Sequence, residues 1–349
     1  MTERGSGGQA KAPVPRWAEC PARRKKLRVA VLYGGRSGEH EVSIRSARSV
    51  MAAMDRTKYE ILAFFITKGG RWKPYALRPE PRANPGIDVV FPVLHGTFGE
   101  DGTVQGLLEL AGLPYVGAGV LASAVAMDKD VTKRLCAERG LPVVEWLVQE
   151  RGRLSVNEVE ARFAYPVFVK PVNLGSSLGI TKAKNRRALK KALELAALYD
   201  TKVIVERAIE GRELECSVLG NEDPQASAPC EIVPSREFYD YADKYLLDGA
   251  RTISVAELPP EKSEEVRRLA LACYQAVNCE GMARVDFLLE AATGRVYINE
   301  INTIPGFTSI SMYPKMWEAA GLPYPRLIDR LIELALARHA ARRQTRYQR

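Results

Sequence analysis

The segment VYINEINTIPG, residues 296–306, combines apolar and polar residues within one strand-like pattern. Val296 and Ile298 are spaced two apart, as in a β-strand with one buried face. Glu300 and Asn302 continue that spacing, so unbroken alternation predicts them on the same face. A strand that begins as core and ends in a carboxylate and a carboxamide needs a chemical explanation.

The preceding stretch, GMARVDFLLE (281–290), is also strand-like, and AATG between the two predicts a tight turn. In such a hairpin Asp286 faces Glu300, and Arg284 faces Asn302. Opposed carboxylates repel, and the pKa of one rises unless a cation lies between them. Oxygen ligands without His or Cys suit Mg²⁺ or Mn²⁺. The alternative is an exposed strand end on which Arg284 neutralises Asp286, and the hairpin alone does not decide.

A glycine- and serine-rich segment, KPVNLGSSLG (170–179), follows the apolar run PVFV. Its backbone N–H groups can approach an anion closely, and Lys170 would add a positive charge. It matches neither a P-loop nor a dinucleotide fingerprint. On its own, such a segment is usually only a turn.

Three further side chains are weak signals when taken singly. Glu206 ends the strand-like VIVE, and Glu213 alternates with apolar residues, where it could bind ribose hydroxyls. A half-exposed strand explains Glu213 equally well. Lys129, in AMDKDVTK, could be an ordinary solvated lysine rather than a binding residue.

Net charge argues against a nucleic-acid-binding body. Of the formal +9, residues 1–27 supply +5 and residues 340–349 supply +4, so the rest of the chain sums to zero. A basic face would need excess charge on the folded body. Six cysteines without a CxxC pair favour a reducing compartment, and the cytoplasm is expected. No apolar run is long enough for a membrane span, and no secretory signal is expected.

Length and pattern indicate a mixed α/β and α+β protein of several domains. Strands at 28–35, 59–66 and 88–94 with an intervening helix predict a parallel sheet. Further along the chain, the pattern predicts a helix at 128–139, a strand at 143–148 and a helix at 186–199. The predicted order is a basic tail, three domains and a second basic tail, at residues 1–27, 28–124, 125–205, 206–339 and 340–349.

These pieces, in this order, resemble the ATP-grasp fold and specifically the D-alanine–D-alanine ligase family, over residues 28 to about 337. The matching stretches are LYGGRSGEHEVS, PVLHGTFGEDGTVQGLLELAGLPYVG, MDKDVTK, VKPVNLGSSLG, EFYDYADKYL, ARVDFLL and NEINTIPGFTSISMYP. The resemblance implies an ATP-grasp fold preceded by a Rossmann-like N-terminal domain.

The resemblance also implies a reaction. ATP would phosphorylate the carboxylate of one D-alanine, and the amine of a second would displace phosphate from the D-alanyl phosphate, giving a peptidoglycan precursor. Two Mg²⁺ ions, or Mn²⁺, would be held on the ATP phosphates by Asp286, Glu300 and Asn302. The implied state is a cytoplasmic homodimer without nucleic-acid or membrane partners.

The family pattern assigns roles to further residues. ATP would contact Lys129, Lys170, Ser176, Ser177, Glu206, Glu213 and Lys244. The first D-alanine would meet Glu39 and His95, while Arg284 and the Gly306 N–H would form an oxyanion hole. Ser311 and the Met312 backbone would bind the carboxylate of the second. Glu39 could instead only stabilise the N-terminus of a helix, and His95 could instead only cap a strand.

The polar, aromatic stretch 235–249 (SREFYDYADKYLLDG) is interpreted as a lid, because an acyl phosphate must be kept from water. In the family pattern Tyr245 would hydrogen-bond with Ser176 and Glu39, and these three with Arg284 form the catalytic set. The alternative is an interaction loop with exposed tyrosines.

Three other functions compete with this one. A D-alanyl-D-lactate ligase resembles the chain but lacks an FYDYADKY-type lid, so Tyr245 favours a dipeptide product. The EHEVS and TSISMYP stretches argue against ATP-grasp enzymes with other substrates, such as a glutathione synthetase. The complete set of phosphate and metal residues argues against a non-catalytic nucleotide-binding module.

Overall fold

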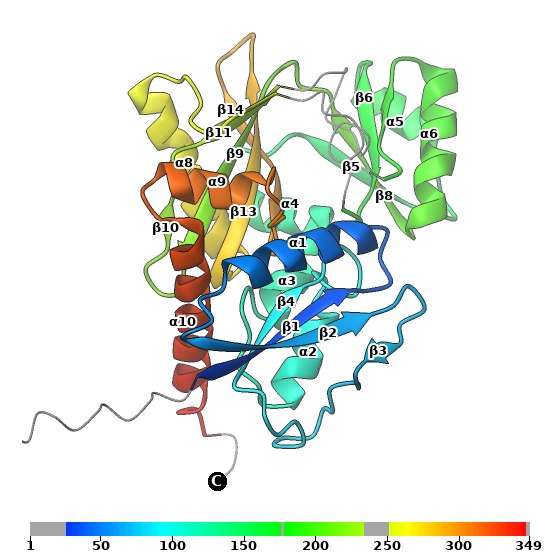
Figure 1. Ribbon diagram of the computed structural model, residues 1–349. Coiled ribbons are helices and arrows are strands. Elements are labelled where there is room, and N and C mark those ends of the chain that lie inside the picture. Colours follow the sequence, from blue (N-terminus) through cyan, green and yellow to red (C-terminus); the bar gives the residue numbers. More distant parts are fainter. Residues whose placement is uncertain (1–25, 176–177, 234–250, 347–349) are drawn as a thin grey trace, which may run out of the picture.

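The computed structural model describes residues 26–175, 178–233 and 251–346. The strands in these ranges form three sheets, each associated with helices (Figure 1). The architecture agrees with the predicted mixture of α/β and α+β parts. Ser176, Ser177 and the whole predicted lid, with Lys244 and Tyr245, lie outside the described residues. No helix in the described ranges is long and apolar enough to cross a membrane.

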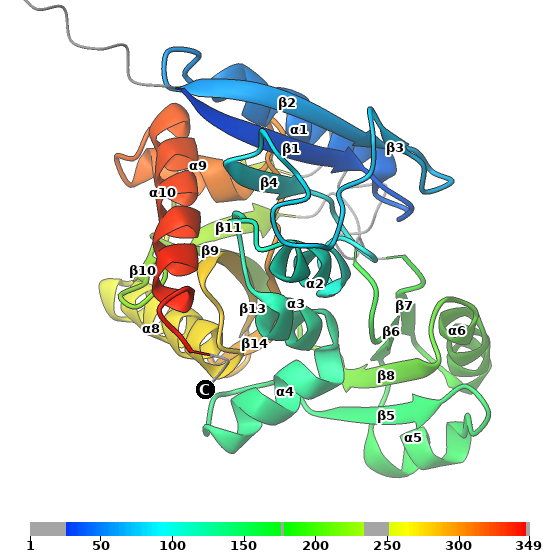
Figure 2. The ribbon, with the colours of Figure 1, turned by 90° about the horizontal axis from the view of Figure 1, so that it is seen from below.

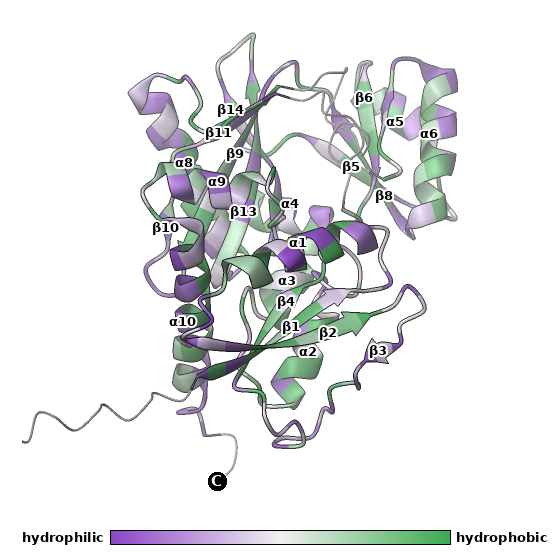
Figure 3. Ribbon diagram, in the orientation of Figure 1, coloured by the Kyte–Doolittle hydropathy of each residue, from purple (hydrophilic) through white to green (hydrophobic). Residues whose placement is uncertain are grey.

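The first sheet has the order β3-β2-β1-β4, with β1 parallel to β2 and β4. Its strands are β1 (Leu27–Gly34), β2 (Tyr59–Ile66), β3 (Trp72–Lys73) and β4 (Val89–Val93). Hydrophobic residues run along β1, β2 and β4 (Figure 3), as expected for parallel strands covered on both faces. Gly34 has φ 91°, and a Cβ there would lie 2.2 Å from the Ile66 carbonyl oxygen, so the turn after β1 requires glycine.

Two helices from opposite ends of the chain cover one face of this sheet: α1 (His40–Ala53) and α10 (Tyr324–Arg342). Val50 of α1 and Leu331 of α10 share one apolar core with Val29 of β1. Both views show α10 beside the first sheet (Figures 1 and 2). The other face packs on α2 (Thr103–Leu110).

α10 continues to Arg342, past the boundary predicted between 339 and 340. Arg342 forms ion pairs with Glu109 and with Glu280, the latter at 3.1 Å. This arginine is therefore part of the folded body, because two carboxylates from other elements hold its side chain. These partners could not be predicted from local pattern, because they lie far away along the chain.

The central sheet is antiparallel, with the order β5-β8-β6-β7, and has an apolar core of its own. Its elements are β5 (Trp146–Glu150), α5 (Val156–Arg162), β6 (Val167–Pro171), β7 (Thr181–Ala183), α6 (Arg186–Tyr199) and β8 (Lys202–Arg207). α6 has the bounds predicted for it. The strand predicted at 143–148 begins later, because Val143 bridges to Ile298 in another sheet.

The third sheet has the order β12-β11-β9-β13-β14, with β10 on β9. Its strands are β9 (Gly211–Gly220), β10 (Gln225–Ala226), β11 (Cys230–Val233), β12 (Arg251–Ile253), β13 (Gly281–Glu290) and β14 (Val296–Asn302). The helices around it are α3 (Val120–Met127), α4 (Lys129–Glu138), α8 (Pro260–Ala276) and α9 (Met312–Ala319). α4 is the helix predicted at 128–139, and Asp128 caps it by accepting a hydrogen bond from the Val131 N–H.

The β13–β14 hairpin has the predicted register, in which Arg284 pairs with Asn302 and Asp286 with Glu300. The prediction that Glu300 and Asn302 share a face with Val296 and Ile298 was wrong. The register shifts after Asp286, where Phe287 pairs with Ile298 and leaves Asn299 as an extra residue, a β-bulge.

The bulge reverses the direction of the side chains that follow it. Val296, Ile298 and Ile301 lie in the core, whereas Glu300 and Asn302 are on the opposite, half-exposed face. Unbroken alternation would have buried both polar side chains beneath the sheet. The bulge therefore explains why a strand that begins as core ends in polar residues: the apolar residues and the polar residues lie on opposite faces of the sheet.

Candidate active site

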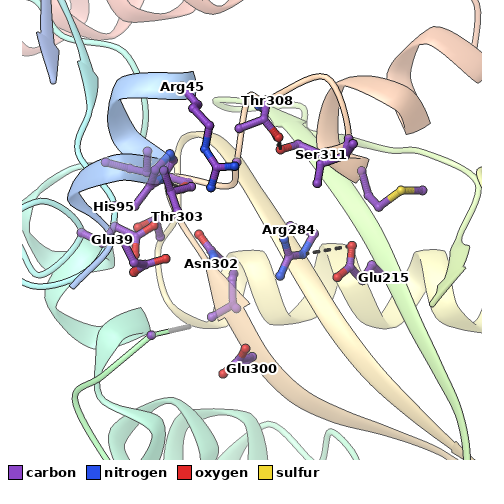
Figure 4. Close-up of a pocket in the computed structure, with 18 of the residues that line it drawn as sticks. Glu39, Arg45, His95, Glu215, Arg284, Glu300, Asn302, Thr303, Thr308 and Ser311 are labelled. Atoms are coloured by element: carbon purple, nitrogen blue, oxygen red, sulfur yellow. Dashed lines mark hydrogen bonds and ion pairs between the residues drawn. The ribbon is translucent and has the colours of Figure 1, made fainter. Parts of the chain in front are cut away.

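A cavity of about 620 Å³ lies where the third sheet meets α1, α4 and the loop after β4. Its size suits a small-molecule site. Figure 4 shows Glu39 and His95 on one side, Arg284 and Glu215 on the other, and Asn302 and Glu300 from β14 between them. Polar side chains thus enter the cavity from both the first and the last parts of the chain.

The polar face of the third sheet supplies one wall. In register across β9 and β13, Glu215 lies opposite Asp286. Arg284 makes two hydrogen bonds to the Asp286 carboxylate, at 2.6 and 2.7 Å, and its Nε lies 3.3 Å from Glu215. Burial alone would lower the pKa of Arg284, but Asp286 and Glu215 outweigh it, and the pKa rises. A fixed, planar cation therefore faces the cavity.

The predicted metal ligands fit a hard cation. Asp286, Glu300 and Asn302 carry side-chain oxygens on two paired strands, and both Asp286 oxygens also accept hydrogen bonds from Arg284. The Asn302 Oδ1 atom is buried and has no hydrogen-bond partner. Such an orphaned acceptor is costly unless something binds it. No cluster of three or more His, Cys, Asp or Glu suited to a metal occurs in the described ranges, so water and ligand oxygens would have to complete a shell.

Two predicted phosphate lysines reach the cavity region from different elements. Lys129, at the start of α4, donates to the Leu174 carbonyl at 2.8 Å and lies 3.4 Å from Glu300. Lys170, the residue before the last in β6, donates to the bulged Asn299 at 3.2 Å. The bulge thus also links the central sheet to the third sheet.

Lys170 belongs to a buried charge triad that the sequence did not reveal. Its Nζ lies 2.6 Å from one oxygen of Glu206, and Lys133 lies 2.8 Å from the other. Burial alone would raise the pKa of Glu206, but the two lysines lower it to about 2. The triad carries a net charge of +1 beside the predicted ATP site, which suits phosphate binding.

The first sheet supplies the opposite wall. Glu39 precedes α1, and a Cβ built on Gly96 would lie 2.6 Å from its Oε2 atom. His95 is tied at both ring nitrogens, to the Ile304 carbonyl and to the Ser46 hydroxyl, each at 2.9 Å. Burial lowers the pKa of His95, so the ring is neutral at pH 7. His95 therefore joins the two walls and lines the cavity.

The segment after β14 closes the cavity. A Cβ on Gly306 would lie 2.6 Å from the Ser311 Oγ atom, so only glycine leaves this backbone accessible. The Ser311 hydroxyl accepts the Thr308 N–H at 3.0 Å. Ser311 also precedes α9, whose first turn carries unpaired backbone N–H groups, a favourable place for a carboxylate.

The structure brings most predicted site residues together. Those that line the cavity are Glu39, His95, Lys129, Arg284, Glu300, Asn302, Gly306, Ser311 and Met312. Asp286, which Arg284 binds, does not line it, and neither do Lys170, Glu206 and Glu213 on β6, β8 and β9. Sequence reasoning missed Lys133, Glu100 and Arg45. Lys133 stands four residues after Lys129, on the same helical face, which was the only available signal.

Comparison with known proteins identifies the class. The model for the D-ala D-ala ligase C-terminus matches residues 135–333, and that for the N-terminus matches 28–85 and 74–118. A solved D-alanine–D-alanine ligase from Coxiella burnetii is 41% identical and superposes with a TM-score of 0.83, covering 91% of this chain and 96% of its own. A solved VanG D-Ala:D-Ser ligase from Enterococcus faecalis is 36% identical with a TM-score of 0.80, covering 89% of this chain and all of its own. The fold is therefore the ATP-grasp fold of ATP-dependent ligases.

Curated sequences narrow the class further. A D-alanine–D-alanine ligase from Solibacter usitatus is 65% identical over 324 residues, covering 93% of this chain and 100% of the relative. D-alanine–D-alanine ligase A from Salmonella typhimurium is 45% identical, covering 90% and 97%. The chain belongs to the D-alanine–D-alanine ligase family.

Proposed function

We propose that this enzyme joins two D-alanines at the expense of ATP, giving D-alanyl-D-alanine for peptidoglycan synthesis. The observation that carries the proposal is the shared cavity, in which the acidic Glu39 end faces the cationic Arg284. An amino acid is a zwitterion, so a site for two of them needs both signs of charge at short range. The predicted oxygen ligands and Lys129, which lie beside them, support binding of the nucleotide at the same cavity.

In the first step, a carboxylate oxygen of one D-alanine attacks the γ-phosphorus of ATP, and ADP leaves. Glu39 holds the ammonium group of this substrate, and Lys129 and Lys170 hold the phosphates. Asp286, Glu300 and Asn302 would bind two Mg²⁺ ions, which neutralise charge on the phosphate oxygens. Positioning and charge stabilisation supply the catalysis, since no described residue needs to act as a nucleophile.

In the second step, the amine of the other D-alanine attacks the acyl carbon, and phosphate leaves. Arg284 and the Gly306 N–H stabilise the negative charge that develops on the carbonyl oxygen. Ser311 and the Met312 backbone N–H hold the carboxylate of the incoming substrate. For Ser176, Ser177, Glu206, Glu213, Lys244 and Tyr245, the proposed roles rest on the family pattern.

The decisive test is a product assay with ATP, Mg²⁺ and D-alanine. One D-alanyl-D-alanine should form for each phosphate released, and omission of D-alanine should stop phosphate release. Competition with D-lactate and D-serine across pH tests the second substrate, because one structural relative is a D-Ala:D-Ser ligase. Dominance of either competitor near neutral pH would refute the dipeptide assignment.

A cytoplasmic homodimer is proposed with this activity. The five cysteines in the described ranges are free and buried, which is compatible with a reducing compartment. Leu110 of α2 and Leu121 of α3 are 65% and 61% exposed, and they give neighbouring helices an apolar surface that a second copy could cover. Light scattering and cell fractionation test the two statements separately.

A further inference from the structure

Glu100, in the loop between β4 and α2, is a buried carboxyl group for which the proposed chemistry has no role. It lines the cavity, although it is only 7% exposed. Its Oε2 atom accepts the Gly96 N–H at 2.9 Å, whereas its Oε1 atom is buried with no hydrogen-bond partner. An unsatisfied buried carboxyl oxygen destabilises the fold. A hydrogen-bond donor on a ligand in the cavity would remove that cost.

The loop that carries Glu100 is fixed in place. The Ser37 hydroxyl donates to the His95 carbonyl at 2.6 Å, and the Gln105 amide donates to the Gly99 carbonyl at 2.8 Å. His95 itself is tied to Ile304 after β14. These contacts fix the backbone of the loop, and the Gly96 N–H holds the Glu100 carboxyl group against it.

Glu39 lies beside the same glycine. A Cβ on Gly96 would be 2.6 Å from the Glu39 Oε2 atom, and the N–H of Gly96 donates to Glu100. Two carboxyl groups, from α1's N-terminus and from the β4–α2 loop, thus converge on one backbone position. Arg284 and Glu300 face Glu100 from the third sheet. Burial, and then the charge of Glu39, raise the pKa of Glu100 well above its usual range.

We propose that Glu100 is a second binding residue for the ammonium group of the first D-alanine, sharing it with Glu39. This inference rests on the proposed function. An ammonium group has three N–H donors, more than one carboxylate oxygen can satisfy. The unpartnered Oε1 atom of Glu100 accepts one of them, and the arriving positive charge offsets the repulsion between the two carboxyl groups.

The competing explanation is structural: Glu100 only accepts the Gly96 N–H. Two variants separate the explanations. Glu100→Gln keeps an acceptor of the same shape for that N–H but removes the acid. Glu100→Asp keeps the acid but shortens its reach.

The assay should report the first substrate alone. Hydroxylamine attacks the acyl carbon of the D-alanyl phosphate and releases phosphate, so D-alanine hydroxamate measures first-site occupancy. We expect the half-saturating D-alanine concentration for hydroxamate formation to rise at least tenfold in Glu100→Gln, and less in Glu100→Asp. The half-saturating ATP concentration should change less than twofold. Glu138→Gln, on the exposed end of α4, is the matched control and should behave as wild type.

A Glu100→Gln variant with wild-type half-saturation, or a greater defect in Glu100→Asp, would overturn the inference. Melting temperatures check folding. If Glu100→Gln does not fold, Glu100→Asp decides: raised half-saturation at an unchanged melting temperature supports the role, and unchanged half-saturation refutes it. Wild-type enzyme that forms neither hydroxamate nor dipeptide would instead refute the proposed function.

Discussion

Replacement of Lys133 by methionine is expected to destabilise the protein through the buried Glu206 triad. Lys133 is 1% exposed, and its ammonium group lies 2.8 Å from Glu206. The lowered pKa of Glu206, about 2 against a usual 4.5, corresponds to roughly 3 kcal/mol of preference for the ionised form. Lys170 remains as a partner in the variant, and methionine fills most of the volume. Burial lowers the pKa of Lys133 itself, so its removal recovers part of the cost of burying that charge. We therefore expect a loss of about 2 kcal/mol at pH 7, below the full penalty for a broken buried pair.

The loss of stability in Lys133→Met should become smaller as pH falls. A carboxyl group whose pKa is lower in the folded state stabilises the fold above its unfolded pKa and stops doing so as pH falls toward its folded pKa. For Glu206 this window runs from about 4.5 down to about 2. Without Lys133 the folded pKa rises, so the difference between wild type and variant should be largest near pH 7 and should shrink below pH 4.5.

Urea unfolding followed by tryptophan fluorescence measures the effect. Trp146 of β5 pairs directly with Glu206 of β8, so its emission reports this sheet. A double-mutant cycle with Glu206→Gln supplies the control, because Lys133→Met should partly rescue a variant that leaves two cations facing an amide. A loss under 0.5 kcal/mol at pH 7, or strict additivity in the cycle, would refute the reasoning.

Three further outcomes are expected. Glu300→Ala should abolish dipeptide formation while leaving the circular dichroism spectrum and melting temperature close to wild type, and a variant with more than a tenth of normal turnover would contradict its role. Gly306→Ala should reduce kcat at least tenfold in steady-state assays, because the new Cβ would lie 2.6 Å from the Ser311 hydroxyl; unchanged kcat would remove Gly306 from the oxyanion site. Tyr245→Phe should still bind ATP but release more phosphate per dipeptide, and full coupling in a phosphate-to-product ratio would reject the lid assignment.

The sequence predicted the hairpin register correctly because a short turn fixes which residues can pair. It did not predict the bulge at Asn299, since an extra residue changes the side-chain direction without any change in composition. The expectation that Glu300 and Asn302 share the face of Ile298 was therefore wrong, although the pairing of Asp286 with Glu300 was right.

Residues whose roles depend on distant partners were the hardest to predict. Lys133 lies on an ordinary amphipathic helix, and only the fold brings Glu206 to it across more than 70 residues. Glu100 sits in a stretch that the family resemblance covers, yet its burial and its unpartnered oxygen depend on the packing of α1 and β14 around the loop. Motif residues could be named from local pattern, whereas the charges that tune them could not.

The apolar core that joins Val29, Leu331 and Met282 spans the first sheet, the last helix and a strand of the third sheet. This shared core packs the first sheet and the last helix into one block, and that block carries both amino-acid-binding walls. The central sheet has a separate core and contacts that block through polar side chains, among them Lys170 with Asn299 at 3.2 Å and Arg207 with Glu290 at 2.8 Å. The two walls of the amino-acid pocket therefore share one core, while β6, which carries Lys170 of the predicted ATP site, packs in another.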